Sequence, residues 1–132
     1  LILAKDLKAG LRAAEASVEA IRQNTRGIIL PFPGGICRSG SKVGSLKYKL
    51  PASTNHPLCP KLREKTQDTL VPEGVDTVYE IVINGLNLDY VKKAMVEGIK
   101  AAVKVPGVVK ITAGNYGGKI GPMKIDLHEI LK

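Results

Sequence analysis

The chain has 132 residues, of which 44% are hydrophobic and 24% charged, a balance that indicates one globular domain and excludes a disordered segment. With four Tyr, one Phe and no Trp, its core depends on aliphatic side chains, and such a core suits a two-layer sandwich of helices on a sheet. The net charge of +8 has two interpretations of equal weight. It attracts an acidic partner, such as nucleic acid, an anionic membrane or a polyanionic small molecule, or it only keeps the protein soluble.

The first third of the chain predicts one amphipathic helix and a short strand. Residues 5–23 carry an apolar stripe at alternating spacings of four and three, formed by Leu7, Leu11, Ala14, Val18 and Ile21. Asp6 is the expected N-cap of this helix. Residues 28–30 predict a short buried strand, and the glycines and prolines of residues 31–44 predict a loop.

The middle of the chain predicts less regular structure and then its clearest strand. Residues 47–50 are a candidate strand, and residues 61–66 predict a short polar helix after an irregular, proline-containing stretch. Residues 77–84, with the sequence Thr-Val-Tyr-Glu-Ile-Val-Ile-Asn, predict a strand rich in β-branched and aromatic side chains. Asn84-Gly85 predicts a turn after it.

A second helix and two further strands are expected after residue 86. Asn87 is the expected N-cap, and the apolar stripe consists of Leu88, Val91, Met95, Ile99 and Ala102. Residues 105–107 end this helix, residues 108–113 predict a strand, and residues 114–119 predict a second glycine-rich loop. Residues 123–127 predict the last strand.

This order of elements predicts an α+β fold formed by residues 1–132 as a single domain. Each helix has one apolar stripe and therefore needs one sheet face to cover it. The expected architecture is a two-layer sandwich, a ferredoxin-like split βαβ arrangement with an antiparallel sheet and the two main helices on one face.

The cysteines, histidines and hydropathy point to a cytoplasmic protein without a metal site. Cys37 and Cys59 are far apart and form no CxxC pair, so a reducing compartment is a simpler expectation than a disulfide framework or zinc. His56 and His128 are isolated, and no Ser-His-Asp or Cys-His arrangement is apparent. No apolar run reaches the length of a membrane span, and no secretory signal is visible. The chain opens on Leu1 inside an apolar segment, which indicates a truncated or trimmed chain.

Glu80 is the residue that the pattern itself singles out. It alternates with Val78 on one face of the strand over residues 77–84, and both faces of that strand are largely apolar, which is typical of a strand covered on each side. Burial disfavours the ionised form of a carboxyl group, so Glu80 is a candidate proton donor or acceptor near neutral pH. The alternative is a structural Glu80 that faces solvent or pairs with a lysine.

The two glycine-rich loops are the other candidate sites. Neither Gly40-Ser41-Lys42 nor Gly117-Gly118-Lys119 matches a P-loop. In the first, Ser41 and not lysine follows the glycine, and the second lacks the upstream glycine. The dinucleotide-binding fingerprint is also absent. Exposed backbone N–H groups beside a lysine can still bind a carboxylate or a phosphate. For each loop the alternative is an ordinary surface loop.

Several motifs, in the same order over nearly the whole chain, resemble the archaeal formylmethanofuran:tetrahydromethanopterin formyltransferase family. They are residues 13–16 (AAEA), 31–36 (PFPGGI), 39–42 (SGSK), 47–49 (KYK), 79–86 (YEIVINGL), 105–108 (VPGV), 112–119 (TAGNYGGK) and 127–129 (LHE). The strand motif and the Ala-Gly-Asn-Tyr-Gly-Gly-Lys motif are the most specific of these.

The resemblance implies that this chain is the C-terminal, distal lobe of a longer two-lobed formyltransferase whose N-terminal lobe is absent. The family implies a homo-oligomer, a dimer or tetramer, with its substrate cleft between subunits. It also implies no metal and no prosthetic group, with formylmethanofuran and tetrahydromethanopterin as carbon-carrier cosubstrates, and neither nucleic acid nor membrane as a partner.

For the site, the resemblance implies that Glu80 is a buried, protonated catalytic carboxyl. A neutral carboxylic acid donates a hydrogen bond to the oxyanion of the tetrahedral intermediate, and such a donor contributes about 3 kcal/mol. The residues expected to bind the anionic carriers are Ser39, Ser41, Lys42, Lys47, Asn115, Tyr116 and Lys119.

Two alternatives stay open. One is a non-catalytic α+β module that binds nucleic acid or a regulatory ligand, which suits the charge of +8 but lacks aromatic residues for base stacking. The other is a lobe that folds and associates without activity of its own.

Overall fold

A computed structural model describes residues 1–39, 55–114 and 121–132. The described residues form an α+β fold with an antiparallel sheet of four strands in the order β3-β4-β1-β6. A separate pair of strands, β2 and β5, is also antiparallel. The strands are β1 (Ile2–Ala4), β2 (Ile28–Ile29), β3 (Cys37–Arg38), β4 (Thr77–Glu80), β5 (Asn84–Gly85) and β6 (Val108–Ile111).

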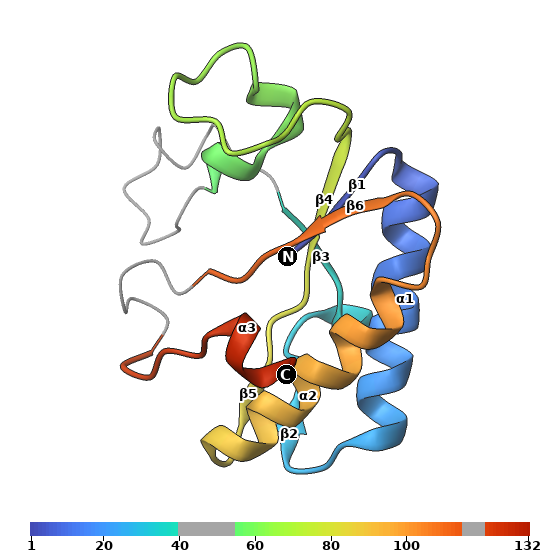
Figure 1. Cartoon of the computed structure of the whole chain (residues 1–132), viewed down its shortest axis with the longest axis vertical. Helices are drawn as coiled ribbons and strands as arrows, with labels where there is room; N and C mark the ends of the chain where they lie inside the picture. Colours follow the sequence, from blue (N-terminus) through green and yellow to red (C-terminus); the bar gives the residue numbers. More distant parts are fainter. Residues whose placement is uncertain (40–54, 115–120) are drawn as a thin grey trace.

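Two main helices, α1 (Leu7–Asn24) and α2 (Leu88–Ala102), pack against each other beside the sheet (Figure 1). Both predicted N-caps are confirmed: Asp6 Oδ1 accepts a hydrogen bond from Ala9 N at 2.7 Å, and Asn87 Oδ1 accepts one from Tyr90 N at 3.0 Å. No helix within the described ranges is long and apolar enough to span a membrane.

The buried face of α1 differs from the predicted stripe. Leu7 and Leu11 are 52% and 40% exposed, whereas the residues in contact with the core are mostly small: Ala9, Gly10, Ala13, Ala14, Ser17, Val18 and Ile21. The reason is steric, because α1 lies so close to the sheet that a Cβ at Gly10 would stand 2.5 Å from Thr77 Cγ2. A face of small residues allows this approach and leucine does not.

The second face of the sheet is covered by the segment of residues 55–76, here called the connector (Figure 1, green). Leu58, Val71 and Val75 of the connector form a buried cluster with Leu3 and Val78 of the sheet. The predicted cover on both faces of β4 is therefore confirmed, since Tyr79 packs in a different cluster with residues of the two helices.

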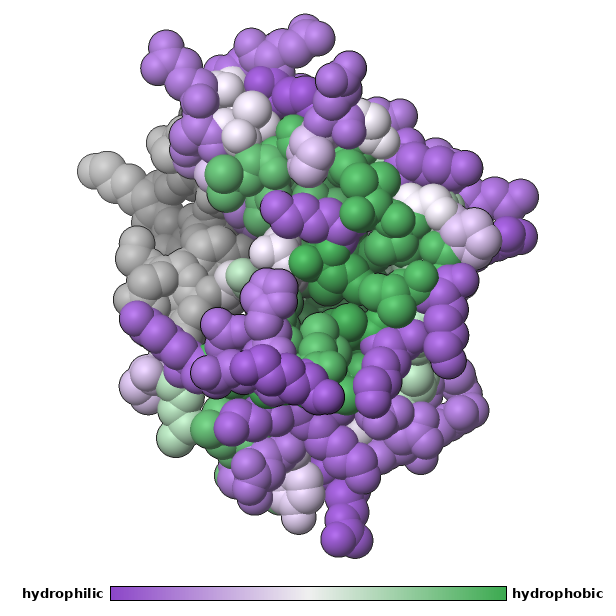
Figure 2. Space-filling view, viewed as in Figure 1, coloured by the Kyte–Doolittle hydropathy of each residue, from purple (hydrophilic) through white to green (hydrophobic). Residues whose placement is uncertain are grey.

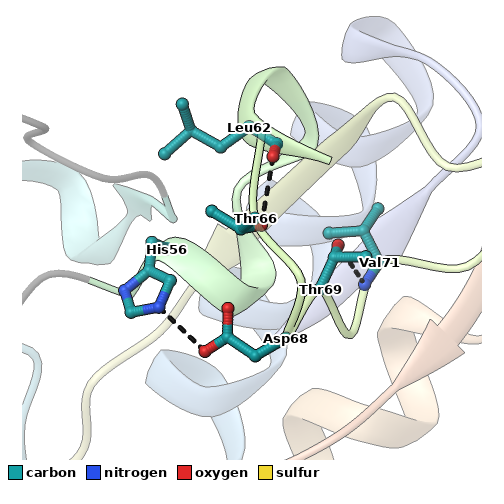
Figure 3. Close-up of polar contacts among 6 residues, drawn as sticks. All are labelled: His56, Leu62, Thr66, Asp68, Thr69 and Val71. Carbon is teal, nitrogen blue, oxygen red and sulfur yellow. Dashed lines mark hydrogen bonds and ion pairs between the residues drawn. The ribbon is translucent and has the colours of Figure 1, made fainter. Parts of the chain in front are cut away.

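The connector is irregular, as its prolines predict. The helix predicted for residues 61–66 is replaced by single 3-10 turns at His56–Leu58 and Pro60–Leu62. Polar contacts hold these turns together: Thr66 Oγ1 donates to Leu62 O at 3.1 Å, and His56 Nε2 lies 2.9 Å from Asp68 Oδ2 (Figure 3).

Three predicted strands have different bounds or a different structure. The strand expected over residues 77–84 ends at Glu80, and Asn84-Gly85 pairs with Ile28–Ile29 instead of forming a turn. Ile29 is 68% exposed, so the expectation of a buried strand there is wrong. The strand expected over residues 108–113 is confirmed as Val108–Ile111.

The last predicted strand, residues 123–127, is wrong. The chain instead forms the short helix α3 (Leu127–Ile130), because the Asp126 carboxylate accepts hydrogen bonds from the His128 and Glu129 backbone nitrogens and caps it. The candidate strand of residues 47–50 and most of the two glycine-rich loops lie outside the described residues.

Candidate functional site

A partly open cavity of about 200 Å³ lies between α2 and the ends of the sheet strands. The stripe residues Val91, Met95 and Ile99 line it from α2 together with Ala94 and Gly98. Gly98 also allows the close contact of α2 with α1, because a Cβ there would stand 2.6 Å from Ser17 Oγ. Figure 2 shows apolar residues gathered over β6 and between β6 and α2, surrounded by hydrophilic residues. The cavity therefore offers an apolar binding surface with few polar groups.

Glu80 lies at the end of β4 and lines this cavity. Its backbone pairs with Cys37 of β3, so the strand register fixes its position. Glu80 is half-buried. This agrees with the partial desolvation expected from the strand pattern, and the burial of Glu80 at the site of formyl transfer stays a prediction.

The main chain of Leu1 lies beside Glu80 at the cavity. The Leu1 backbone nitrogen donates a hydrogen bond to Thr112 O at 2.9 Å, and Thr112 N donates to Leu1 O at 3.0 Å. These two contacts extend the pairing of β1 with β6 to the cavity.

Asn55 connects Glu80 to Ser39. Its Nδ2 donates to Glu80 Oε1 at 3.0 Å and to Ser39 Oγ at 3.2 Å. Ser39 is 4% exposed, its backbone nitrogen donates to Val78 O at 2.8 Å, and its hydroxyl lies 3.5 Å from Leu58 O. The structure thus brings together two residues that the sequence predicted separately.

Asn55 itself was not expected from the sequence. It stands in a proline-containing stretch without periodicity, and its contact with Glu80 spans 25 positions. Because the Ser39 hydroxyl is engaged inside the chain, Ser39 supports Asn55, and its direct contact with a substrate stays a prediction. Glu80 forms no salt bridge with any described lysine, so the alternative of a lysine-paired Glu80 finds no support in that part of the chain.

The other predicted binding residues, Ser41, Lys42, Lys47, Asn115, Tyr116 and Lys119, lie outside the described residues. The residues that flank these two segments are described. Ser39 and Asn55 belong to the hydrogen-bond network of Glu80, and Gly114 lines the cavity. The described residues Ser39, Asn55 and Gly114 therefore lie at the candidate site.

The two cysteines and two histidines are the remaining candidates for metal or nucleophile chemistry. No disulfide joins Cys37, whose backbone pairs with Glu80, to the buried Cys59. His56 pairs with Asp68 at the surface of the connector, and His128 is exposed on α3. Among the described residues, no group of three or more His, Cys, Asp or Glu side chains is arranged to hold a metal ion.

A family model described as "FTR, proximal lobe" matches residues 1–130. The chain belongs to the FTR family. The description names this lobe proximal, so the expected term, distal, is wrong. The resemblance drawn from the sequence motifs is otherwise confirmed.

Curated relatives of this FTR lobe are archaeal formylmethanofuran–tetrahydromethanopterin formyltransferases. The Archaeoglobus fulgidus protein is 57% identical over 130 residues, which are 98% of this chain and 43% of that protein. The Methanothermobacter thermautotrophicus protein is 52% identical over 130 residues, with the same two coverages. The chain therefore spans less than half the length of the curated relatives it matches.

Two solved structures share the fold. The formylmethanofuran:tetrahydromethanopterin formyltransferase from Methanosarcina barkeri has a TM-score of 0.87 and 52% identity, over 98% of this chain and 43% of that chain. The formyltransferase/hydrolase complex from Methylorubrum extorquens, solved with methylofuran, has a TM-score of 0.85 and 40% identity, over 99% and 43% of the two chains.

Proposed function

We propose that this chain is the C-terminal lobe of a cytoplasmic formyltransferase that transfers a formyl group from formylmethanofuran to tetrahydromethanopterin. The enzyme serves archaeal one-carbon metabolism, including methanogenesis. The single observation that carries the proposal is the placement of Glu80. This residue belongs to one of the two most specific family motifs and is the last residue of β4, where it lines the cavity and accepts a hydrogen bond from Asn55. The identity of 57% to a curated formyltransferase supports it.

The fold supports a finer proposal as well. The strand order β3-β4-β1-β6 has α1 after β1 and α2 before β6. This corresponds to a ferredoxin-like split βαβ unit, in which two crossovers place both helices on one face. Such a unit leaves the ends of the central strands β1 and β4 open beside the helices, which is where Glu80 lies.

The proposed reaction is a direct transfer through a tetrahedral intermediate. An amine of tetrahydromethanopterin attacks the formyl carbon and forms the new C–N bond, which gives a tetrahedral carbon with an oxyanion. Collapse of the intermediate breaks the C–N bond to methanofuran, and the proton lost by the attacking amine goes to the departing amine. Atoms and charges then balance without a covalent enzyme intermediate.

Glu80 stabilises the oxyanion in this scheme. In its neutral form the carboxyl donates a hydrogen bond to the oxygen that becomes negative, and it keeps its own proton at the end of the reaction. A preorganised donor of this kind lowers the activation free energy by roughly 3 kcal/mol. The half-buried position of Glu80 in a partly open cavity fits a site that another lobe or subunit completes.

In this proposal, positively charged side chains bind the two carriers. The carriers are anionic cosubstrates, and no metal or prosthetic group is part of the scheme. The formal charge of +8 favours their approach, and Lys42, Lys47 and Lys119 are the proposed contacts together with Ser41, Asn115 and Tyr116. The proposed assembly is a homo-oligomer with the cleft between subunits.

The test measures formyl transfer by the full-length enzyme that contains this lobe. Glu80→Ala should lower kcat by about 10²- to 10³-fold, and Glu80→Gln should lower it less, because an amide N–H still donates but is a weaker donor than a neutral acid. Glu73→Gln, an exposed change on the connector, is the matched control and should leave kcat unchanged. Full activity of Glu80→Ala with a preserved fold would remove Glu80 from the mechanism.

The net charge favours one second candidate, a module that binds nucleic acid. Affinity for random oligonucleotides that falls steeply with salt, together with no formyl transfer by the intact enzyme, would support that function instead.

A further inference from the structure

The hydrogen bonds around Glu80 diverge from the Asn55 amide, which donates to Glu80 Oε1 and to Ser39 Oγ, while Ser39 donates to Leu58 O. We propose that Asn55 is a positioning residue that fixes which oxygen of Glu80 carries the proton used in formyl transfer. This inference rests on the proposed function, because it concerns the neutral form of Glu80 in that reaction.

The donors and acceptors can be assigned from the carbonyl of Leu58, which can only accept a hydrogen bond. The Ser39 hydroxyl faces this carbonyl, with its Oγ 3.5 Å from Leu58 O. Both residues are buried, with exposures of 4% for Ser39 and 7% for Leu58. Ser39 has a single O–H, and in this buried position it donates that hydrogen to Leu58 O. Its Oγ is then left as an acceptor.

The orientation of the Asn55 side-chain amide follows from this. The group that faces Ser39 Oγ at 3.2 Å must be a donor, and it is Nδ2. The flipped amide would place Oδ1 against an oxygen whose hydrogen is already used. Since Nδ2 carries two hydrogens, one points to Ser39 Oγ and the second to Glu80 Oε1 at 3.0 Å.

The consequence for Glu80 concerns its two oxygens. Oε1 receives the hydrogen of Asn55 and therefore acts as an acceptor, so the proton of neutral Glu80 is on Oε2. A carboxylic acid has one donor hydrogen, and the network reserves that donor for Oε2, the oxygen left for a substrate at the cavity. Without Asn55 the proton is shared between both oxygens, and the acid donor is no longer held in one direction.

The alternative role for Asn55 is purely structural: its hydrogen bonds attach the connector to the sheet. The two roles differ in their consequences. Loss of a tether lowers stability and leaves the kcat of the folded enzyme unchanged, whereas loss of a positioning residue lowers kcat and leaves the KM for both carriers nearly unchanged, since Asn55 does not contact them in this account.

The test uses three variants of the full-length enzyme. Asn55→Ala, which removes the donor, should lower kcat by about 10-fold, and Asn55→Asp, which replaces the donor with an acceptor of the same shape, by about 10²-fold. The KM values should stay within about twofold of those of the wild type. Ser39→Ala should lower kcat less than either, because the Asn55–Glu80 hydrogen bond stays possible. Asn87→Ala is the control outside the site and should leave kcat unchanged.

A double-mutant cycle makes the test specific to Glu80. In the Glu80→Ala background, measured under single-turnover conditions with excess enzyme, Asn55→Ala should cause no further loss, because there is no carboxyl to orient. Additive losses, or an unchanged kcat for both Asn55 variants in an active and folded enzyme, would overturn the proposal.

Neutron diffraction from crystals of the deuterated full-length enzyme provides a readout independent of activity. The proposal expects two deuterons on Asn55 Nδ2, directed to Ser39 Oγ and Glu80 Oε1, and the Ser39 deuteron directed to Leu58 O. A deuteron on Glu80 Oε1, or Asn55 Oδ1 facing Glu80, would overturn it. If the wild-type enzyme transfers no formyl group, the proposed function fails instead, and the neutron map still decides the direction of the hydrogen bonds.

Discussion

Gly10 on α1 lies so close to Thr77 on β4 that a Cβ at Gly10 would stand 2.5 Å from Thr77 Cγ2 and 2.9 Å from Tyr79 Cδ2. Gly10→Ala should therefore destabilise the protein by about 1 kcal/mol. Overpacking costs roughly 1–3 kcal/mol, and the better helix propensity of alanine offsets about 1 kcal/mol of that cost. The measurement is the free energy of unfolding from urea titration.

Two variants control this experiment. Gly121→Ala places the same methyl group where nothing lies within 4 Å of it, so stability should stay within about 0.5 kcal/mol. Thr77→Ser, introduced into the Gly10→Ala protein, removes Cγ2 and should restore part of the loss. A Gly10→Ala protein as stable as the wild type would mean that α1 moves away from the sheet at little cost.

Thr77 also has a buried hydroxyl without a hydrogen-bond partner among the described residues, which is unfavourable for stability. The residue is 1% exposed, and Oγ1 forms no hydrogen bond among the described residues. Thr77→Val keeps the shape and replaces the unsatisfied hydroxyl with a methyl group, so it should stabilise the protein by about 1 kcal/mol. The paired change Thr66→Val removes a hydrogen bond to Leu62 O and should destabilise by about 0.5–1 kcal/mol. The measurement is the thermal unfolding midpoint, which should rise for Thr77→Val and fall for Thr66→Val.

The N-cap of α2 gives a third prediction. Asn87 Oδ1 accepts the hydrogen bond of Tyr90 N at 3.0 Å, so Asn87→Ala should cost about 1 kcal/mol of stability. Asn87→Asp keeps the accepting oxygen and adds a negative charge at a helix N-terminus, so stability should be equal or slightly higher at low salt. Equal loss in both variants would show that the asparagine side chain acts through another contact.

The surface pair of His56 and Asp68 should contribute little. Their side chains are 38% and 60% exposed, and pairs exposed to this extent are worth about 0–1 kcal/mol. Asp68→Asn keeps an oxygen opposite His56 Nε2 and should change stability by less than about 0.5 kcal/mol. A larger loss that disappears at high salt would show that charge, and not the hydrogen bond, holds this end of the connector.

Local signals in the sequence predicted the helix ends well. Asp6 and Asn87 cap α1 and α2 because a cap depends only on neighbours within three residues. The buried face of α1 was not predictable in the same way, since periodicity registers hydrophobicity and not volume. Leu7 and Leu11 fit the stripe, but the short distance between helix and sheet excludes large side chains there.

Tertiary pairing overrode local signals elsewhere. Asn84-Gly85 has the composition of a turn, yet its backbone pairs with Ile28–Ile29 from a distant part of the chain. Residues 123–127 have the alternation of a strand, but Asp126 provides a helix cap at their end. The pairing of Asn84-Gly85 is not encoded within a window of ten residues, whereas the Asp126 cap is a local signal that competed with the alternation and prevailed.

The candidate site likewise contains one residue that the sequence predicted and one that it did not. Glu80 was found because a carboxyl in an apolar strand is visible in the alternation of the sequence, and the family motif supported it. Asn55 was missed because it has no pattern of its own, and only the path of the connector over the sheet brings it to Glu80. Hydrogen-bond partners of a site residue that are supplied by irregular segments leave no periodic trace in a sequence.

The irregular structure of the connector determines how often the hydrogen bond between Asn55 and Glu80 opens. Its 3-10 turns contain few backbone hydrogen bonds, in contrast to the helices on the other face, and such segments open locally at a lower free energy than the sheet does. Amide hydrogens of the connector should thus exchange with solvent before those of β1 and β4. Under the proposed role of Asn55, each opening separates it from Glu80 while the sheet stays folded. The fraction of molecules with an oriented Glu80 carboxyl then equals the fraction in which the connector is closed.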